Sequence, residues 1–366
     1  MECESGISIK EVLDVIVPKG WFLPVVPGTS YVTIGGAIAN DIHGKNHHNH
    51  GSFGNFIEYM EVLKSNGDYL ICSIDENPEL FKSSIGGLGL TGIILKAKIK
   101  LIKIENNFIN TISVQFSSLE EFFNLNLKFE NQYDYTVSWI DFDLKKLGNI
   151  RGVYHAGNHD KNINNSKKVK SRKLKKDIRI KIPFTLPFSL VNNFTIKILN
   201  NLYYNIFSKR SSYNQNYKKF FFPLDTIENW SKAYGPKGFY QYQFLIPSKN
   251  AHEVINSISA LLKKYNQKPA LGVLKSFGNI ESLGYISFPK KGITLALDLQ
   301  NKGEITLKLL NDLDKLILDY EGRLYPAKDC RMSKDTFKTG YKNIEDFKKN
   351  IDPKFNSSFF ERILSN

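Results

Sequence analysis

A glycine-rich stretch between residues 27 and 54 constrains the fold of this chain more than any other feature of its sequence. Short apolar runs, too short to predict helices, separate its glycines, which are Gly28, Gly35, Gly36, Gly44, Gly51 and Gly54. Glycine tolerates positive φ and close backbone contact. Such a stretch is therefore typical both of ordinary tight turns and of backbone N–H groups that face an anion or a flat ligand.

The spacing of these glycines excludes two common phosphate-binding motifs. Neither the dinucleotide fingerprint G-x-G-x-x-G nor the P-loop occurs in the stretch. Gly87, Gly89 and Gly92 do have the G-x-G-x-x-G spacing, but they follow a predicted helix and precede a predicted strand. That order is the reverse of the one in a dinucleotide-binding fold, so we do not assign them to a nucleotide.

Histidines in the same stretch raise the alternative of a metal site. His43 and His47 have the i, i+4 spacing of zinc-binding helices, and His48 and His50 follow them. Gly44 lies between the first two, and no carboxylate stands at motif spacing to complete a ligand set. We therefore predict no metal site. We expect instead a polar pocket in which His43 and Lys45 face an anionic or hydroxylated group.

Three runs within the stretch form a more specific pattern. They are Pro27-Gly28-Thr29, residues 32–39 and the unbroken run Asp41-Ile42-His43-Gly44-Lys45-Asn46-His47-His48. With residues 90–94, 234–236, 241–244 and 325–329, this pattern resembles the decaprenylphosphoryl-β-D-ribose 2′-oxidase family, which belongs to the FAD-linked oxidases of the vanillyl-alcohol-oxidase fold. The resemblance spans nearly the whole chain and is weakest between residues 155 and 215.

The resemblance implies an α+β fold. Residues 1–105 would form an FAD-binding domain of the vanillyl-alcohol-oxidase type. Residues 106–320 would form an α+β substrate or cap domain on an antiparallel sheet, with a basic loop near residues 165–190, and residues 321–366 would return to the FAD-binding domain. In the family, a glycine- and arginine-rich turn around the FAD pyrophosphate comes before the part that Met1 matches. We therefore expect an N-terminally incomplete FAD-binding domain that binds FAD weakly by itself.

Hydrophobic periodicity predicts elements that agree with this fold. Apolar residues at helical spacing predict helices at residues 7–17, 251–265 and 305–320. Apolar or alternating runs predict strands at residues 21–23, 57–63, 69–73, 91–104, 137–142, 241–246 and 293–299. Asn66-Gly67 is a strong signal for a hairpin between the second and third of these strands.

The resemblance also assigns residues to two ligands. Those that match flavin contacts are Gly28, Thr33, Ile34, Gly35, Gly36, Asn40, Asp41, Ile42, His43, Ile94 and Tyr325. Those that match the substrate pocket are His43, Lys45, Tyr234, Gln241, Gln243, Lys275 and Lys328. Because side chains alternate along a strand, Gln241 and Gln243 share one face, where they would hydrogen-bond sugar hydroxyls or, alternatively, face solvent.

Lys328 is the predicted catalytic residue, because the matching lysine of the family lies between flavin and substrate. Oxidation of a secondary alcohol needs a group that takes the hydroxyl proton while hydride leaves carbon for the flavin. A lysine crowded by apolar groups has a lowered pKa and is suited to this role. The alternative interpretation is an exposed lysine that pairs with Asp329.

The positive charge of the chain is concentrated in one segment. The formal net charge is +14, and residues 167–181 carry nine lysines and arginines against Asp177 alone. An apolar, proline-broken segment follows at residues 182–188. A solvated loop is one interpretation, whereas the basic and apolar combination more specifically predicts an anionic membrane surface or a lipid phosphate. Because the charge is not spread along a helix with stacking aromatics, we expect no nucleic-acid partner.

The sequence also bears on the compartment of the protein. Three cysteines without a C-x-x-C pair favour a reducing compartment. No apolar run is long enough to predict a transmembrane helix. We expect a cytoplasmic protein that attaches peripherally to the inner face of the membrane.

The resemblance implies FAD-dependent oxidation of the 2′-hydroxyl of a polyprenylphosphoryl-β-D-ribose to the 2′-keto sugar. A separate NADH-dependent keto-reductase would then complete the epimerisation of ribose to arabinose. One alternative is a sugar-lactone or alditol oxidase of the same fold. Another is a flavin-free remnant, or a subunit completed by a partner chain.

Overall fold

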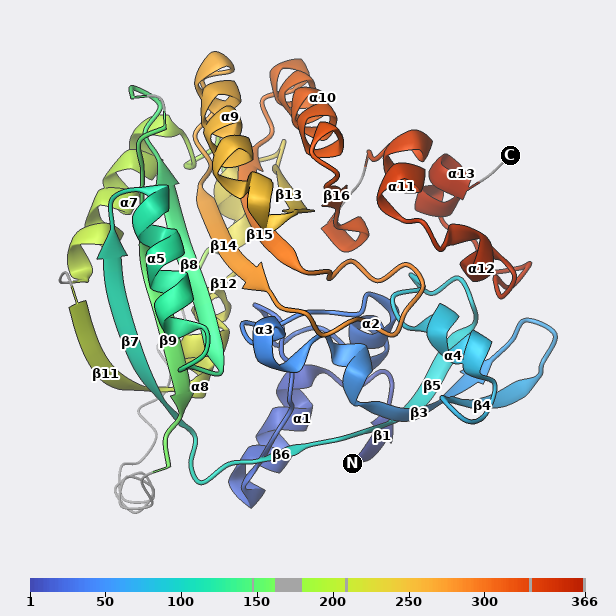
Figure 1. Cartoon of the computed structure of the whole chain (residues 1–366). Coiled ribbons are helices and arrows are strands. Elements are labelled where there is room, and N and C mark those ends of the chain that lie inside the picture. The colour runs from blue at the N-terminus through green and yellow to red at the C-terminus, as the bar shows by residue number, and fades with distance from the viewer. Residues whose placement is uncertain (147, 162–179, 208–209, 329–330, 365–366) are drawn as a thin grey trace.

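Two antiparallel sheets organise the chain in this computed structural model, which describes residues 1–146, 148–161, 180–207, 210–328 and 331–364. A four-stranded sheet has the order β1-β5-β3-β4, and an eight-stranded sheet has the order β11-β7-β9-β8-β14-β15-β13-β16 (Figure 1). Helices pack on both sheets, so the predicted α+β fold is confirmed. Residues 162–179, which hold most of the predicted basic loop, lie outside the described residues.

The four-stranded sheet holds the N-terminal part of the chain. Its strands are β1 (Glu2–Glu4), β3 (Ile57–Leu63), β4 (Tyr69–Ser73) and β5 (Ile93–Ile99). The predicted hairpin is confirmed, because β3 pairs antiparallel with β4 and Gly67 has the positive φ of +92° that a tight turn demands. Helix α1 (Ile9–Ile16) begins with a capping box between Ser8 and Glu11, and its apolar side is buried in the same core.

The apolar run inside the glycine-rich stretch is helical, which corrects our expectation that it is too short for a helix. Helix α2 (Ile34–Ala39) begins at Thr33, whose side chain accepts a hydrogen bond from the Gly36 N–H at 3.1 Å. Ile34 and Ile38 are fully buried. The cap and this burial offset the low helix propensity of two adjacent glycines.

The eight-stranded sheet is the centre of the second region. Its strands are β7 (Phe108–Phe116), β8 (Tyr135–Phe142), β9 (Ile150–His159), β11 (Arg210–Asn216), β13 (Phe239–Ile246), β14 (Leu271–Phe277), β15 (Gly292–Gln300) and β16 (Arg323–Leu324). The predicted strands at residues 137–142, 241–246 and 293–299 are confirmed as parts of β8, β13 and β15. We did not predict β7, β9, β11 or β14, because Asn, Ser, His and Gly interrupt their apolar alternation.

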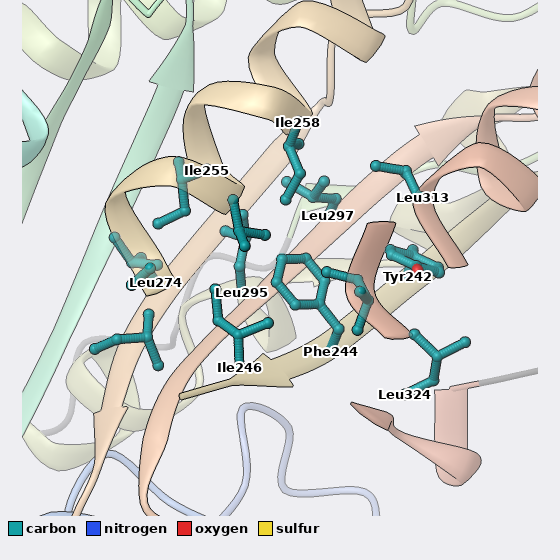
Figure 2. Close-up of a cluster of buried hydrophobic side chains, with 14 of the residues drawn as sticks. Tyr242, Phe244, Ile246, Ile255, Ile258, Leu274, Leu295, Leu297, Leu313 and Leu324 are labelled. Carbon is teal, nitrogen blue, oxygen red and sulfur yellow. The ribbon is translucent and has the colours of Figure 1, made fainter. Parts of the chain in front are cut away.

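One face of this sheet is an apolar core covered by helices. Leu295, Leu297 and Leu299 of β15 are fully buried. They pack with Tyr242, Phe244 and Leu274 of neighbouring strands and with Ile255, Ile258 and Leu313 of the covering helices (Figure 2). These helices are α5 (Leu119–Phe129), α9 (Ala251–Lys264) and α10 (Glu304–Asp319), of which the last two confirm the predicted helices. Because side chains alternate along a strand, Thr294 and Asp298 point to the opposite face.

The remaining elements connect the two sheets or cover their edges. The helices are α3 (His47–His50), α4 (Pro78–Ser84), α7 (Asn193–Ile206), α8 (Tyr217–Phe221), α11 (Lys334–Gly340), α12 (Ile344–Lys348) and α13 (Ser358–Leu364). Short strands pair as β2 (Trp21–Phe22) with β6 (Ile102–Lys103) and β10 (Ile180–Lys181) with β12 (Ile227–Glu228). No helix within the described ranges is both long and apolar enough to cross a membrane.

The C-terminal segment touches both regions. Strand β16 joins the large sheet beside β13. Further along, the Asp352 backbone N–H donates to the Leu90 carbonyl at 2.8 Å, and the Asp352 carboxylate lies 3.5 Å from Lys64 Nζ. These contacts hold the segment against the loops of the small sheet.

Candidate active site

The polar face of the large sheet brings together most of the residues predicted to contact substrate. In the register of the sheet, Lys275 of β14 stands opposite Thr294 of β15, and Gln241 of β13 stands opposite Asp298 of β15. Directly opposite residues share a face. Gln241 Nε2 donates to Asp298 Oδ1 at 2.8 Å, and Gln243 Nε2 donates to Thr294 Oγ1 at 3.2 Å. The glutamines therefore face protein groups, not bulk solvent.

His43 links this face to the glycine-rich stretch. Its Nε2 accepts a hydrogen bond from Gln243 Nε2 at 3.0 Å, so the imidazole N–H is on Nδ1. Nδ1 lies 3.1 Å from Lys275 Nζ, and that amine also donates to the Gly44 carbonyl at 3.4 Å. A neutral Lys275 amine accepts the Nδ1–H. Residues more than 200 positions apart thus form one connected hydrogen-bond network.

Burial accounts for the protonation states in this network. It lowers the pKa of Lys275 to about 7, with a smaller contribution from the nearby positive charge of Lys328. Burial also holds the pKa of His43 well below its usual range, and Lys275 adds to the effect. His43 is therefore a neutral imidazole at pH 7, whereas Lys275 exchanges between ammonium and amine near that pH.

This arrangement predicts an unusual lysine titration. Lys45 is the second lysine whose pKa is lowered to about 7, again mainly by burial. In protein labelled with ¹³C at lysine Cε, two lysine signals should shift near pH 7, because both side chains are ammonium below this pH and amine above it. One signal should disappear in Lys275→Gln and the other in Lys45→Gln. If every lysine titrates near its ordinary value of about 10.4, the network as described is wrong.

Lys328 and Tyr325 enter the site from the C-terminal segment. The turn after β16 carries Lys328, which lines a small cavity together with Gln241, Gln243 and Tyr325. Burial of the ammonium lowers the pKa of Lys328, and the charge of Asp298 partly opposes this effect. The same burial raises the pKa of Asp298 to about 6, so this carboxylate is mostly ionised at pH 7. The charges of Lys328 and Asp298 therefore interact, although the Lys328 side chain as a whole is exposed. Asp329, the partner in the alternative interpretation, lies outside the described residues.

Asp41 supports the turn that carries His43. Its carboxylate is fully buried and accepts hydrogen bonds from Ser52 Oγ and the Gly54 N–H, both at 2.8 Å. Asp41 also has a positive φ of +38°, which a short polar side chain tolerates better than most. Burial raises its pKa. The turn is further fixed by Tyr325, whose hydroxyl donates to the Asn40 carbonyl at 3.2 Å.

The predicted flavin contacts differ in how accessible they are. Ile34, Ile42 and Ile94 are buried in the core of the N-terminal region, whereas Gly28 and Thr33 are exposed and Gly35 and Gly36 are half-buried. A Cβ added to Gly28 would meet no atom within 4 Å, so open space borders the backbone there. A Cβ on Gly35 would lie 3.0 Å from Ser5 Cβ, and one on Gly36 would lie 3.1 Å from Thr33 Oγ1.

Side chains of the glycine-rich stretch fit a large polar cofactor such as FAD. Both ring nitrogens of His47 are buried and have no hydrogen-bond partner among the described residues, and the Phe277 ring centre lies 4.3 Å from that of His47. Asn46 Oδ1 is also buried without a partner there. Buried polar atoms are normally paired, so these atoms favour a ligand that the protein chain itself does not supply. Exposed glycine backbone at Gly28 suits a flat ring system.

Two predicted substrate residues lie at the margins of the network. Lys45 Nζ donates to the Phe220 carbonyl and lies 4.5 Å from the centre of the Phe220 ring. Tyr234 is buried and stacks on Phe239 at 4.3 Å. Burial raises the pKa of Tyr234, and the nearby charge of Asp298 adds to this rise. The structure thus places Tyr234 near Asp298 and Lys45 against α8.

Sequence reasoning missed several residues of the site. Asp298 and Thr294 alternate with the buried leucines of a strand that we did predict, and that alternation was the available signal. Phe277 and Phe288 flank His43, with ring centres 4.7 and 5.8 Å away, but nothing in their sequence context distinguishes them from core residues. Within the described ranges, no group of three or more His, Cys, Asp or Glu side chains is arranged to hold a metal ion.

Comparison with known proteins assigns the family. The family model described as an FAD binding domain matches residues 1–73. Decaprenylphosphoryl-β-D-ribose oxidase of Mycolicibacterium smegmatis is 34% identical over 362 residues, which cover 96% of this chain and 78% of the relative. An uncharacterized protein of Streptomyces coelicolor is 25% identical over 351 residues, covering 93% of this chain and 94% of that protein.

A more distant relative matches only part of the chain. D-arabinono-1,4-lactone oxidase of Yarrowia lipolytica is 31% identical over 99 residues, which cover 27% of this chain and 19% of that enzyme. The FAD-binding match, together with the residues that fit the cofactor, makes FAD the cofactor of this chain, which is an FAD-linked oxidoreductase. Because 96% of this chain aligns with that oxidase at 34% identity, the chain belongs to the decaprenylphosphoryl-β-D-ribose oxidase family of FAD-linked oxidases.

Proposed function

We propose that this protein oxidises the 2′-hydroxyl of a polyprenylphosphoryl-β-D-ribose to the 2′-keto sugar. The observation that carries the proposal is the convergence of Lys328, Gln241, Gln243 and Lys275 beside the His43 turn. These side chains come from three separate parts of the chain. They offer a proton acceptor and hydrogen-bonding amides next to the region that matches an FAD-binding domain.

In the proposed reaction the chain positions the sugar and accepts a proton. Bound FAD supplies the acceptor for the hydride that leaves C2′. The amine of Lys328 takes the proton from the 2′-hydroxyl, so that the C–O bond becomes a carbonyl. Burial lowers the pKa of Lys328 from its ordinary value, which makes its neutral amine more accessible as a proton acceptor. Asp298 then stabilises the ammonium that forms.

The side-chain amides of Gln241 and Gln243, which would bind the sugar, are oriented by hydrogen bonds to neighbouring side chains. Gln241 keeps its amide orientation through Asp298, and Gln243 keeps its own through His43 and Thr294. A side chain fixed in this way loses little entropy when it binds a hydroxyl group. The predicted substrate contacts are thus already oriented by neighbouring residues.

Two further parts of the proposal concern partners and location. A separate NADH-dependent keto-reductase would reduce the 2′-keto sugar to the arabinose epimer. Because a polyprenyl tail stays in a bilayer, the protein would work at the membrane surface, peripherally attached on the cytoplasmic side. The basic and apolar residues at 167–188 support this location by their composition.

The test is anaerobic mixing of the FAD-loaded protein with a synthetic polyprenylphosphoryl-β-D-ribose of short chain length. Flavin absorbance should fall, and mass spectrometry should find a product with two hydrogen atoms fewer. The 2′-deoxy analogue is the matched control and should leave the flavin oxidised. Reduction by D-arabinono-1,4-lactone but not by the lipid-linked ribose would contradict the proposal and favour the sugar-lactone oxidase alternative.

A further inference from the structure

Helix α7 (Asn193–Ile206) has its polar side toward the protein. Asn200 Nδ2 donates to the buried carboxylate of Asp141 at 2.7 Å, and the Tyr203 hydroxyl lies 3.1 Å from His155 Nε2. Arg151 donates to the Asn201 side chain. A helix on the surface of a globular protein normally packs its apolar side against the core. Here hydrogen bonds to the sheet join the packing of Ile196 and Tyr203 in holding the helix.

The outer side of α7 is apolar and exposed. Its large apolar residues have exposed fractions between 45% at Ile198 and 74% at Ile206, and they are Phe194, Ile198, Leu199, Leu202 and Ile206. At 100° per residue these side chains fall within one arc of about 140°. Lys197 is exposed and flanks this arc. The helix is therefore amphipathic, but its apolar stripe faces outward and is exposed.

The segment before α7 extends the same kind of surface. Phe184, Phe188 and Leu190 have exposed fractions of 62, 60 and 45%. The Leu190 N–H donates to the Ala233 carbonyl at 2.8 Å, so this segment runs beside the turn that ends at Tyr234. The exposed apolar surface thus reaches from α7 to the neighbourhood of the candidate active site. We call these eight residues the α7 surface: Phe184, Phe188, Leu190, Phe194, Ile198, Leu199, Leu202 and Ile206.

The sequence segment that carries the α7 surface is basic, although Glu228 of β12 stands opposite Lys181. Between Asp177 and Asp225 the sequence contains no Asp or Glu, but it contains Arg179, Lys181, Lys197, Lys209, Arg210, Lys218 and Lys219. Of these, Lys181, Lys197, Lys218 and Lys219 are exposed in the described part of the chain, and Lys218 lies 3.0 Å from Asp14. Apolar residues that insert shallowly beside cations are typical of helices that lie in the interface of an anionic membrane.

Strand register places α7 on the same face of the large sheet as the substrate residues. Arg151 stands opposite Asp141, and both contact α7. Trp139, two residues from Asp141, packs on Tyr203 of α7 and stands opposite Val273 of β14. Lys275 is two residues from Val273 and therefore points the same way. Helix α5 covers the opposite face, through Asn126 and Tyr154 (Figure 1).

We propose that the α7 surface docks the protein onto an anionic bilayer and thereby turns the substrate face of the large sheet toward the membrane. A second copy of this chain is a poorer occupant, because two such surfaces would bring like charges together. The inference names the surface for the membrane association proposed above, and it rests on that part of the proposed function. It needs neither the ribose substrate nor the bound cofactor.

The experiment is co-sedimentation of the full chain with phosphatidylcholine vesicles, with and without phosphatidylglycerol. Leu199→Ser/Leu202→Ser should weaken binding to the anionic vesicles by about tenfold or more, because two exposed leucines no longer insert. Leu127→Ser is the matched control: Leu127 is 69% exposed on α5, on the opposite face, and this variant should bind like the parent. Leu199→Phe/Leu202→Phe should retain binding, and circular dichroism should confirm that every variant is folded.

Four results would overturn the inference. The first is a parent that binds no vesicle, and the second is a Leu199→Ser/Leu202→Ser variant that binds as well as the parent. The third is equal loss of binding in Leu127→Ser. The fourth is a concentration-dependent dimer of the parent that the Leu199→Ser/Leu202→Ser variant abolishes while vesicle binding persists, which would assign the surface to a second copy. None of these results affects oxidation of a short-chain substrate in detergent, so failure here is distinguishable from failure of the proposed function.

Discussion

Replacing Lys328 by alanine is expected to slow flavin reduction by substrate about 10²–10⁴-fold, the usual contribution of a general acid or base. The protein should still bind FAD, because the resemblance assigns Lys328 to the substrate pocket and not to the flavin contacts. Without the amine, the proton of the 2′-hydroxyl has no acceptor next to Asp298 as hydride departs. Flavin absorbance after rapid anaerobic mixing with the polyprenylphosphoryl-β-D-ribose measures the rate.

Two further variants separate the role of Lys328 from general effects of charge. Lys338→Ala removes an exposed lysine from α11 and should react at the parent rate. Lys328→Arg keeps the positive charge, but a guanidinium does not accept a proton at neutral pH, so this variant should remain slow. A normal rate of flavin reduction in Lys328→Ala would remove Lys328 from the mechanism.

Replacing Gly28 by valine is expected to weaken FAD binding about 100-fold while the fold persists, since overpacking of a well-fitted site typically costs about 1–3 kcal/mol. The backbone at Gly28 does not need positive φ, and an added Cβ meets no atom of the chain within 4 Å. Any loss of affinity therefore reports on the space in front of that backbone. Quenching of FAD fluorescence measures the affinity, and circular dichroism checks the fold.

A graded substitution tests the steric origin of this effect. Gly28→Ala should weaken binding less than Gly28→Val, because its side chain projects less far into the same space. Gly36→Val should abolish FAD binding, but its Cβ would lie 3.1 Å from Thr33 Oγ1, so this variant disturbs the cap of α2 as well. If Gly28→Val binds FAD as tightly as the parent, Gly28 does not face the cofactor.

Local patterns in the sequence determined much of the fold and the family. Asn66-Gly67 between two apolar runs predicted the hairpin of β3 and β4 at its observed bounds, because hairpin turns depend on the residues within them. Helical spacing likewise predicted α1, α9 and α10. The unbroken run from Asp41 to His48 identified the family of FAD-linked oxidases, which the comparison with the Mycolicibacterium smegmatis oxidase bears out.

Elements whose stability comes from distant contacts were not predictable in the same way. Helix α2 contains two adjacent glycines, and it forms because Thr33 caps it and the core buries Ile34 and Ile38. Helix α7 has its apolar side outward, and the carboxylate of Asp141 and the ring of His155 hold its polar side. Hydrophobic periodicity predicts an amphipathic helix, but it does not predict whether the apolar or the polar side packs against the protein.

The sequence by itself thus determined the type of many elements, the family and the residues that match its ligands. Only the tertiary structure decided that His43, Gln243 and Lys275 form one network, and that Asp298 faces Lys328 and Gln241. The physical reason is that the register of three strands and the burial of the polar face bring these groups together. That same burial lowers the pKa of Lys275 and raises that of Asp298. Neither the register of the strands nor the burial of these side chains can be predicted from the pattern of residues along the chain.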